Sequence, residues 1–387
     1  MKPVVLKLTL FAALAATLGG CSDAIFAAID TAQKTATNTL SQTMSVFDIA
    51  VPVPGTYYVA AGGIFQGVLG GTTVNWTPNT STSSRPWNPT GLICNAMTLL
   101  GANLYGGFVA SDGTASLYQS SPTPFSFASG AKQLTTQTPG EQVTGLSTDG
   151  TNVFVSGAVF SSASNSYVFQ LEYATPANAV AGAWGTPALS GQSYPVLPVA
   201  YASGGTPTWW TASGTTLYST TALPAFTGVS SVVTGSGSVS LGTINGVFAN
   251  GTAVIVATKS NGVFYSLTGG GAGSWVQVQP DHQGSVTVSY LCAAGPIDKS
   301  GSSSTYLVGS DGYGYYSLNV STGSLSRYGD STTALYSASV SRIVLDNTTA
   351  TPLNVVLMGT NAKGLWRTVY DAVGGNVPAS GQSWINE

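Results

Sequence analysis

The sequence predicts an all-β fold, a seven-bladed β-propeller of four-stranded antiparallel blades. Two observations carry this prediction. A turn followed by a short strand with an aromatic residue recurs seven times, and the repeats lie about 50 residues apart. Short strands and polar or glycine-led turns of this period are typical of propellers with one repeat per blade. The recurring aromatic residues are Phe65, Tyr118, Phe169, Tyr218, Phe264, Tyr316 and Trp366.

The N-terminus predicts an exported protein. Lys2 and Lys7 form a short basic start, and an apolar run over residues 8–18 follows. The run is too short to span a bilayer as a helix, and it is typical of a secretory signal. We therefore assign residues 1–20 to a signal peptide that precedes the ring.

The apolar run ends in Leu18-Gly19-Gly20-Cys21, which resembles the lipobox of bacterial lipoproteins. The resemblance implies cleavage before Cys21 and acylation of that residue, palmitate included, which would anchor the chain in a lipid bilayer of the cell envelope. Ser22 then favours the outer membrane, on either its periplasmic or its surface side. The alternative is an ordinary signal peptide cleaved nearby, with Cys21 an incidental thiol.

Residues 21–44 are predicted to be a lipidated tether between the anchor and the ring. The spacing of Ile25, Phe26 and Ile29 suits a short helix. A flexible tether without a helix fits the same composition.

Residues 45–387 are predicted to form the ring of seven blades. Dipeptides such as Asp149-Gly150 and Asn250-Gly251 mark hairpin turns, because they tolerate positive φ. In the third repeat the outer strand is expected near Trp184. The seventh repeat has its own outer strand at Trp384, so no strand is left over to close the ring by exchange, although residues 45–51 could pair across the junction.

The segments 257–266 and 359–368 resemble the blade hairpins of sialidase-type repeats and of the photosystem assembly factors of plants and cyanobacteria. The strict Asp-box of the sialidase type is absent. The lipobox followed by a single ring is also similar to the propeller lipoproteins of spirochaetes, most of which have no assigned function.

The charge of the chain excludes one class of partner. Charged residues make up 6% of the sequence, the net charge is −3, and no basic stripe occurs, so nucleic acid is excluded.

Cys94 and Cys292 fall on the first strands of the second and sixth repeats. Blades so far apart cannot bring two α-carbons within about 7 Å, so we expect both thiols to be free.

The residues that carry chemistry are few. His282 is the only histidine, which leaves no histidine-based metal cluster, and no nucleophile motif accompanies the Asp281-His282 step. We therefore expect no catalytic residues, no metal and no cofactor. Half of a catalytic dyad is the alternative interpretation of Asp281-His282.

A candidate binding face follows from the topology. Loops that join one blade to the next emerge at the same end of the ring as the turns between second and third strands. Trp87, on a proline-braced loop, could dock a peptide or a sugar, or fold onto its own blade. The candidate residues are Arg85, Trp87, Asp112, Lys259, Asp281, His282, Asp311, Tyr313 and Lys363.

Two functions remain open from the sequence. The first is a membrane-anchored, non-catalytic scaffold that binds a protein or a glycan at the cell envelope. The alternative is a propeller-type glycan hydrolase or lyase, which would need several converging carboxylates or a Tyr–Arg constellation. The sequence has 14 acidic residues, and many of them belong to turns, which favours the scaffold.

Overall fold

The computed structural model describes residues 40, 42–70, 73–77, 92–110, 113–120, 132–136, 141–297, 305–346, 354–372 and 375–387. Cys21, Arg85, Trp87 and Asp112, which the sequence analysis singles out, lie outside these ranges, as do the signal peptide and most of the tether. Within the described ranges, no helix has the length and apolar character needed to cross a membrane.

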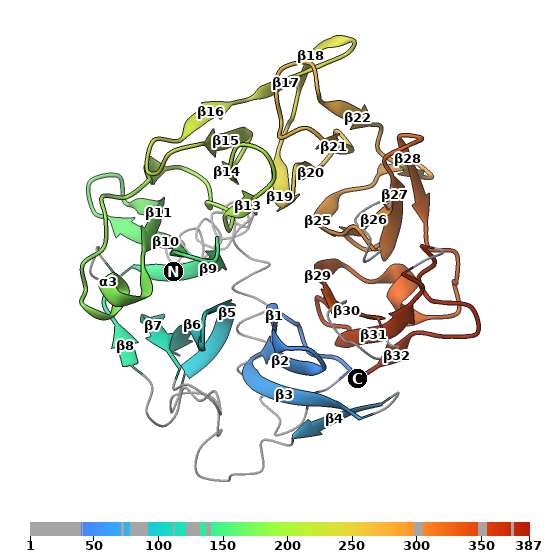
Figure 1. Cartoon of the computed structure of the whole chain (residues 1–387), viewed down its shortest axis with the longest axis horizontal. Helices are drawn as coiled ribbons and strands as arrows, with labels where there is room; N and C mark the ends of the chain where they lie inside the picture. Colours follow the sequence, from blue (N-terminus) through green and yellow to red (C-terminus); the bar gives the residue numbers. More distant parts are fainter. Residues whose placement is uncertain are drawn as a thin grey trace, which may run out of the picture.

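The chain folds into seven four-stranded antiparallel sheets arranged as blades around a central axis (Figure 1), which confirms the predicted propeller. Each blade runs outward from the axis in chain order. The strands of the first four blades are β1 (Asp48–Val53), β2 (Thr56–Ala61), β3 (Gly63–Gly70) and β4 (Thr73–Thr77); β5 (Leu92–Leu100), β6 (Asn103–Ala110), β7 (Ala115–Gln119) and β8 (Lys132–Leu134); β9 (Gln142–Thr148), β10 (Val153–Ser161), β11 (Ser166–Ala174) and β12 (Leu189–Gln192); β13 (Ala200–Ala202), β14 (Thr208–Ser213), β15 (Thr216–Thr220) and β16 (Thr227–Val229).

The last three blades follow the same plan, and two small hairpins lie between blades. The blade strands are β19 (Ile244–Asn250), β20 (Ala253–Thr258), β21 (Val263–Ser266) and β22 (Val276–Val278); β25 (Tyr290–Ala294), β26 (Thr305–Ser310), β27 (Tyr315–Asn319) and β28 (Ser324–Arg327); β29 (Val340–Asp346), β30 (Asn354–Thr360), β31 (Leu365–Tyr370) and β32 (Ile385–Asn386). The hairpins are β17 (Ser231–Thr234) with β18 (Gly237–Ser240), and β23 (His282–Gln283) with β24 (Val286–Thr287).

One expected strand is replaced by a helix. The outer strand of blade 3 is β12, not a strand at Trp184. Helix α3 (Pro176–Val180) comes first, because Thr175 caps it by accepting a hydrogen bond from the backbone of Asn178, and proline suits the first helical turn. Trp184 is buried after this helix in the core between blades 2 and 3. A 3-10 helix, η1 (Ala334–Ser337), precedes the last blade.

The recurring aromatic residues all lie on third strands and fill the space between neighbouring blades. Phe65, Phe264 and Tyr316 are at most 1% exposed. Six of the seven pack toward the preceding blade. Phe169 of β11 is the exception, because it packs toward blade 4. The opposite face of β11, which faces blade 2, therefore carries other side chains.

Among the residues that the structure describes, no strand is exchanged between the first blade and the last. The segment that precedes β1 lies against blade 7, where the Val46 amide donates to the Thr360 carbonyl and the Gly364 amide donates to the Met44 carbonyl, both at 2.9 Å. Between blades 6 and 7, the Gly314 amide donates an equivalent hydrogen bond to the Ala338 carbonyl at 2.9 Å. The junction of blades 7 and 1, here called the seam, thus repeats an ordinary contact between blades.

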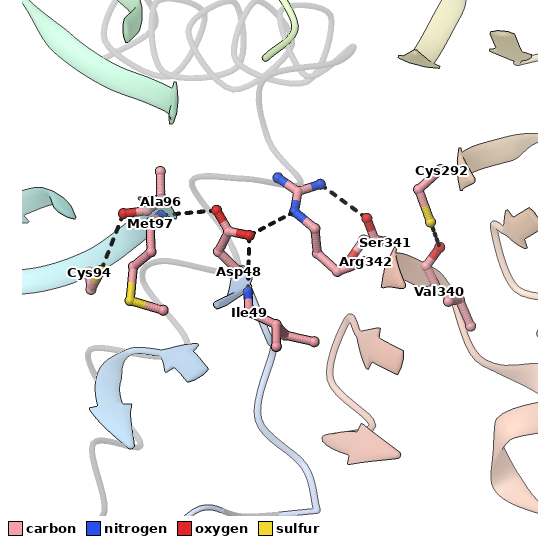
Figure 2. A network of polar contacts seen from close by, with 9 residues as sticks. All are labelled: Asp48, Ile49, Cys94, Ala96, Met97, Cys292, Val340, Ser341 and Arg342. Carbon is pink, nitrogen blue, oxygen red and sulfur yellow. Dashed lines mark hydrogen bonds and ion pairs between the residues drawn. The ribbon is translucent and has the colours of Figure 1, made fainter. Parts of the chain in front are cut away.

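Side chains add to the seam near the axis (Figure 2). The Asp48 carboxylate on β1 lies 3.5 Å from the Arg342 guanidinium on β29, and it accepts hydrogen bonds from the backbone amides of Ile49 and of Met97 on β5. Asp48 therefore connects blades 7, 1 and 2. Burial raises the pKa of Asp48, although Arg342 and the two amides act in the opposite direction.

Two further carboxylates join the seam. Glu387 accepts a hydrogen bond from the indole of Trp76 on β4 at 2.8 Å and pairs with Arg367 on β31. Asp346 on β29 accepts from the amide of Gly55 and from the hydroxyl of Tyr57 in blade 1. Three acidic residues thus connect the last blade to the first.

The two described cysteines are free, as predicted. Figure 2 shows them on opposite sides of the axis, Cys94 on β5 and Cys292 on β25. Burial raises the pKa of the Cys292 thiol to about 12, and it raises that of Cys94 as well. Neither thiol is therefore a ready nucleophile at neutral pH.

Candidate functional site

The six candidate residues that the structure describes lie at one end of the ring, as the topology requires. Asp281 and His282 belong to the connection between β22 and β25. Lys259, Asp311 with Tyr313, and Lys363 lie in the turns between the second and third strands of blades 5, 6 and 7. We call the surface formed by these connections, together with Gln283, Arg327, Tyr336, Ser337 and Ser339, the 5–7 face.

Arg327, at the end of β28, is the centre of the 5–7 face. Its guanidinium donates to the carbonyls of Tyr313 and Tyr336 at 3.1 and 2.8 Å, and to the side-chain oxygen of Gln283 at 3.0 Å. It also lies over the rings of both tyrosines, 3.6 Å from the centre of Tyr336 and 5.2 Å from that of Tyr313. A rigid, planar group with several donors suits this task. One side chain thereby fixes three separate connections relative to one another.

Asp281 extends this arrangement toward the core. Its carboxylate accepts hydrogen bonds from the Gln283 amide at 2.6 Å and from the Tyr316 hydroxyl at 2.9 Å, and its backbone amide donates to the Tyr290 hydroxyl at 3.0 Å. Burial raises the pKa of Tyr316, and the hydrogen bond to Asp281 raises it further. Asp281 is therefore a structural anchor of the loop.

Blades 6 and 7 are joined on the same face by two more polar contacts. The Lys363 ammonium donates to the carbonyl and the hydroxyl of Ser337 at 2.8 and 2.7 Å. The Asp311 carboxylate accepts from the Ser339 hydroxyl at 2.6 Å. Both candidates predicted from the sequence thus hold the loop of η1 against neighbouring turns.

His282 and Lys259 are exposed on the face. The His282 ring lies 3.4 Å from the Thr287 hydroxyl, and its backbone amide donates to the Asp281 carboxylate. That carboxylate does not contact the imidazole in the described contacts, so the two side chains are not arranged as a catalytic dyad. Lys259 is exposed in the turn of blade 5 and makes no hydrogen bond with the rest of the face in the described ranges.

The 5–7 face presents aromatic rings and groups that can carry either charge. Tyr313 and Tyr336 present half-buried rings whose faces are supported by Arg327. Exposed ammonium, imidazole and carboxylate groups surround them. Among the residues that the structure describes, no group of three or more His, Cys, Asp or Glu side chains is placed to hold a metal ion.

Sequence reasoning missed Arg327, Gln283 and Tyr336. Arg327 stands out in the sequence only as one of 11 basic residues, at the end of a serine-rich strand. Its partners are separated from it by 9 to 44 residues, and only the folded loops bring them together. The sequence signals of turns thus located the face but not the residue that organises it.

Comparisons with known proteins identify the fold of the chain but assign it to no family. No family model matches the sequence, and no curated protein was found as a relative. The solved structure titled "YCF48 bound to D1 peptide" is similar, with a TM-score of 0.56 and 10% identity, over 86% of this chain and 94% of that one. A computationally designed protein, Ika8, matches with a TM-score of 0.50 and 11% identity, over 88% and 87%. These likenesses establish that the chain has the architecture of known β-propellers.

Proposed function

We propose that the protein is a non-catalytic scaffold whose 5–7 face binds an extended segment of a partner protein. The observation that carries this proposal is the Arg327 centre, because it fixes three connections into one preorganised surface. Preorganisation lowers the entropic cost of binding, since few side chains must be ordered by the partner. The propeller whose title names a bound peptide supports the choice of a protein partner over a glycan.

The residues of the 5–7 face divide into two roles. Arg327, Asp281 and Lys363 use their polar groups within the protein, so they position the surface. Tyr313 and Tyr336 present aromatic rings, which contribute large contact areas at low entropic cost. Lys259, His282 and Asp311 flank these rings with charges of both signs. A polar, extended segment with mixed charge fits this surface.

We further propose that acylated Cys21 holds this scaffold at the bacterial envelope, in the outer membrane. The lipobox resemblance supports the lipid anchor, and Ser22 supports the outer membrane as its location. A tethered protein is confined to a surface, which raises its effective concentration toward partners in the same membrane.

No observation on the described residues favours the glycan hydrolase or lyase. A lyase would need a Tyr–Arg constellation, and Tyr313 and Tyr336 do lie beside Arg327. The donors of Arg327, however, already form hydrogen bonds with groups of the protein. Arg327 lies on β28, the outermost strand of blade 6, far from the axis, where the catalytic groups of a sugar-cleaving site would converge. Asp281, the acid beside the only histidine, is bonded to Tyr316 and Gln283.

The test is a pull-down from detergent-solubilised envelopes with matched tyrosine variants. The wild-type chain and a Tyr167→Ala control, which removes a tyrosine that is 44% exposed on another blade, should retain the same partner. The double variant Tyr313→Ala/Tyr336→Ala should lose it by tenfold or more. Equal capture by all three proteins, or turnover of a glycan by the purified wild type, would contradict the proposal.

A further inference from the structure

The hairpin of β10 and β11 projects from the ring. Both strands have nine residues, whereas the second and third strands of the other blades have four to eight. Strand β9 pairs with β10 only as far as Ala158, and β12 pairs with β11 only at Phe169 and Leu171. Among the described residues, the end of the hairpin over 159–168 therefore pairs only with itself.

The projecting end carries exposed aromatic side chains. Phe160 and Tyr167 lie opposite each other in the hairpin and are 53% and 44% exposed, and their rings meet edge to face with centres 5.5 Å apart. Tyr194, in the connection from blade 3 to blade 4, is 60% exposed. Within the described ranges, every aromatic side chain that is exposed, and not merely half-buried, belongs to this set of three. We call these three residues the aromatic tip.

The three side chains of the aromatic tip gather on one side of the hairpin. Side chains alternate between the two faces of a strand, so Phe160 and Tyr167 share the face of Phe154 and Phe169, which pack between blades 3 and 4. Tyr194 lies on that side as well. Its ring covers Gly214, in the turn between the second and third strands of blade 4, where an added β-carbon would come within 2.6 Å of the ring.

The aromatic tip lies in an uncharged part of the chain. Between Val153 and Lys259 the sequence has one charged residue, Glu172, and its side chain is fully buried. A surface without charges leaves water at little cost in solvation. The tip is also convex, whereas small-molecule sites are concave, and its edge-to-face rings offer no flat platform for a sugar. These properties favour a broad, apolar partner such as a bilayer.

The tether joins the ring at the same end as the aromatic tip. Met44, the last residue of the tether, accepts a hydrogen bond from the amide of Gly364, in the turn between the second and third strands of blade 7. The turn of the β10–β11 hairpin is the equivalent turn of blade 3. A bilayer that holds acyl chains at Cys21 is therefore tethered to the end of the ring from which the aromatic tip projects.

We propose that the aromatic tip docks on the surface of the bilayer that holds the lipid anchor. Phe160 enters the upper acyl region, and Tyr167 and Tyr194 lie at the level of the headgroups, where an apolar ring with a hydrated hydroxyl is favoured. The inference rests on the proposed anchor at Cys21, since so small an apolar surface binds a bilayer weakly when it acts alone. Blade 3 lies across the axis from the 5–7 face, so docking leaves that face uncovered (Figure 1).

The acylated chain, reconstituted in phosphatidylcholine vesicles, provides the test. A small fraction of the lipid carries a photoactivatable diazirine near its headgroup, and mass spectrometry identifies the labelled residues. Label should concentrate on residues 158–169 and 192–196. High salt should leave it unchanged, since no charge takes part.

Matched variants assign the label to the aromatic side chains. The triple variant Phe160→Ser/Tyr167→Ser/Tyr194→Ser should lose about tenfold or more of the label in these segments and stay on the vesicles through its acyl chains. Val53→Ser removes a side chain that is 53% exposed at the opposite end of the ring, and it should keep the label. The pull-down on the 5–7 face is carried out in detergent, where no bilayer is present, so Tyr167→Ala remains a valid control there.

Failure of the anchor and failure of the aromatic tip give different results. A chain whose mass shows no acyl group contradicts the anchor alone; it is then mixed with the same vesicles at high lipid concentration, where the aromatic tip should still take up the label. Label confined to the tether of a vesicle-bound chain, or spread evenly over the ring, would overturn the docking of the tip. Sedimentation of the unacylated chain checks a second copy as the occupant: a dimer that the triple variant abolishes would also overturn it.

Discussion

The hydroxyl of Tyr316, a fully buried residue of β27, donates its hydrogen bond to the carboxylate of Asp281 at 2.9 Å. Asp281, a loop residue, thereby provides a hydrogen-bond acceptor for the hydroxyl of Tyr316, whose ring packs in the core between blades 5 and 6. Its neighbour in sequence, His282, is exposed, and among the described contacts its side chain bonds only Thr287. Two adjacent residues of the 5–7 face therefore contribute very differently to stability.

Replacing these neighbours one at a time should separate their contributions. Asp281→Ala should lower the free energy of unfolding by about 1–3 kcal/mol, because it leaves the Tyr316 hydroxyl and the Gln283 amide without their acceptor. His282→Ala should change it by less than about 0.5 kcal/mol. Urea unfolding of both variants measures the difference, and equal losses would mean that the Asp281 contacts contribute nothing to stability.

The seam should depend more on Asp48 than on its ion pair. Asp48→Ala should cost about 2–3 kcal/mol of unfolding free energy, because it removes the acceptor of two backbone amides. Arg342→Ala should cost about 1 kcal/mol or less, since the arginine side chain is 37% exposed and the pair is partly screened. The double variant in a thermodynamic cycle gives the pair energy directly. A larger loss for Arg342→Ala would reverse this ranking.

The contribution of Glu141, a buried residue just before β9, to stability should fall as pH rises through the neutral range. The pKa of Glu141 is raised from 4.5 to about 8, so the folded state keeps a proton that the unfolded state has lost. The contribution of Glu141 to stability is therefore fully present below about pH 4.5 and is lost as pH rises to about 8, by roughly 2–4 kcal/mol. Urea unfolding at several pH values measures the decline.

Glu141→Gln is the matched variant for this pH dependence. It keeps the shape of the side chain and removes the titration, so its stability should change less between pH 5 and pH 8. Asp48, whose pKa is also raised, leaves a residual slope of the same sign. A wild type and a variant with the same slope would show that Glu141 is not the titrating group.

The thiols give a separate check on the blade assignment. Denaturing alkylation without reductant should modify both Cys94 and Cys292 in a chain that carries Cys21→Ser. In the native state Cys94, which is fully buried, should react far more slowly than an exposed thiol. Loss of two mass units relative to the reduced chain would reveal a disulfide, which the positions of β5 and β25 do not allow.

The anchor is tested by Cys21→Ser. If Cys21 is acylated, this variant should move from the membrane fraction to the soluble fraction, because its tether loses the buried acyl chains. Metabolic labelling with palmitate should mark the wild type and not the variant. A variant that stays fully in the membrane fraction would disprove the lipid anchor.

The sequence predicts the ring well because one unit repeats. Phe65, Phe264 and Tyr316 occupy equivalent third strands, and turn dipeptides separate the strands that flank them. Blade 3 breaks the pattern: Phe169 keeps the period, yet it faces the opposite side. In a strand the two faces alternate residue by residue, so spacing within a repeat does not fix which face an aromatic residue takes.

The Glu141–Glu172 pair and the Arg327 centre lie beyond what the sequence reveals. Glu141, just before β9, lies near Glu172 on the face of β11 that turns toward blade 2, and Gly157 of β10 leaves space for its side chain. Arg327 meets its partners only when connections from blades 5, 6 and 7 are stacked side by side. Both arrangements depend on contacts between blades, while sequence patterns report mainly on the structure within one.

Each blade consists of strands that follow one another in the chain. The seam is held by a short paired segment and by three carboxylates, and within the described ranges no strand crosses it. A ring of this kind changes size simply. Tandem duplication or loss of about 50 residues adds or removes a whole blade and leaves the hydrogen-bonded strands of every other blade intact. Rings closed by exchange of a strand lack this freedom at their junction, because both chain ends must contribute to one sheet. The seam therefore makes this architecture suited to gain or lose blades during evolution.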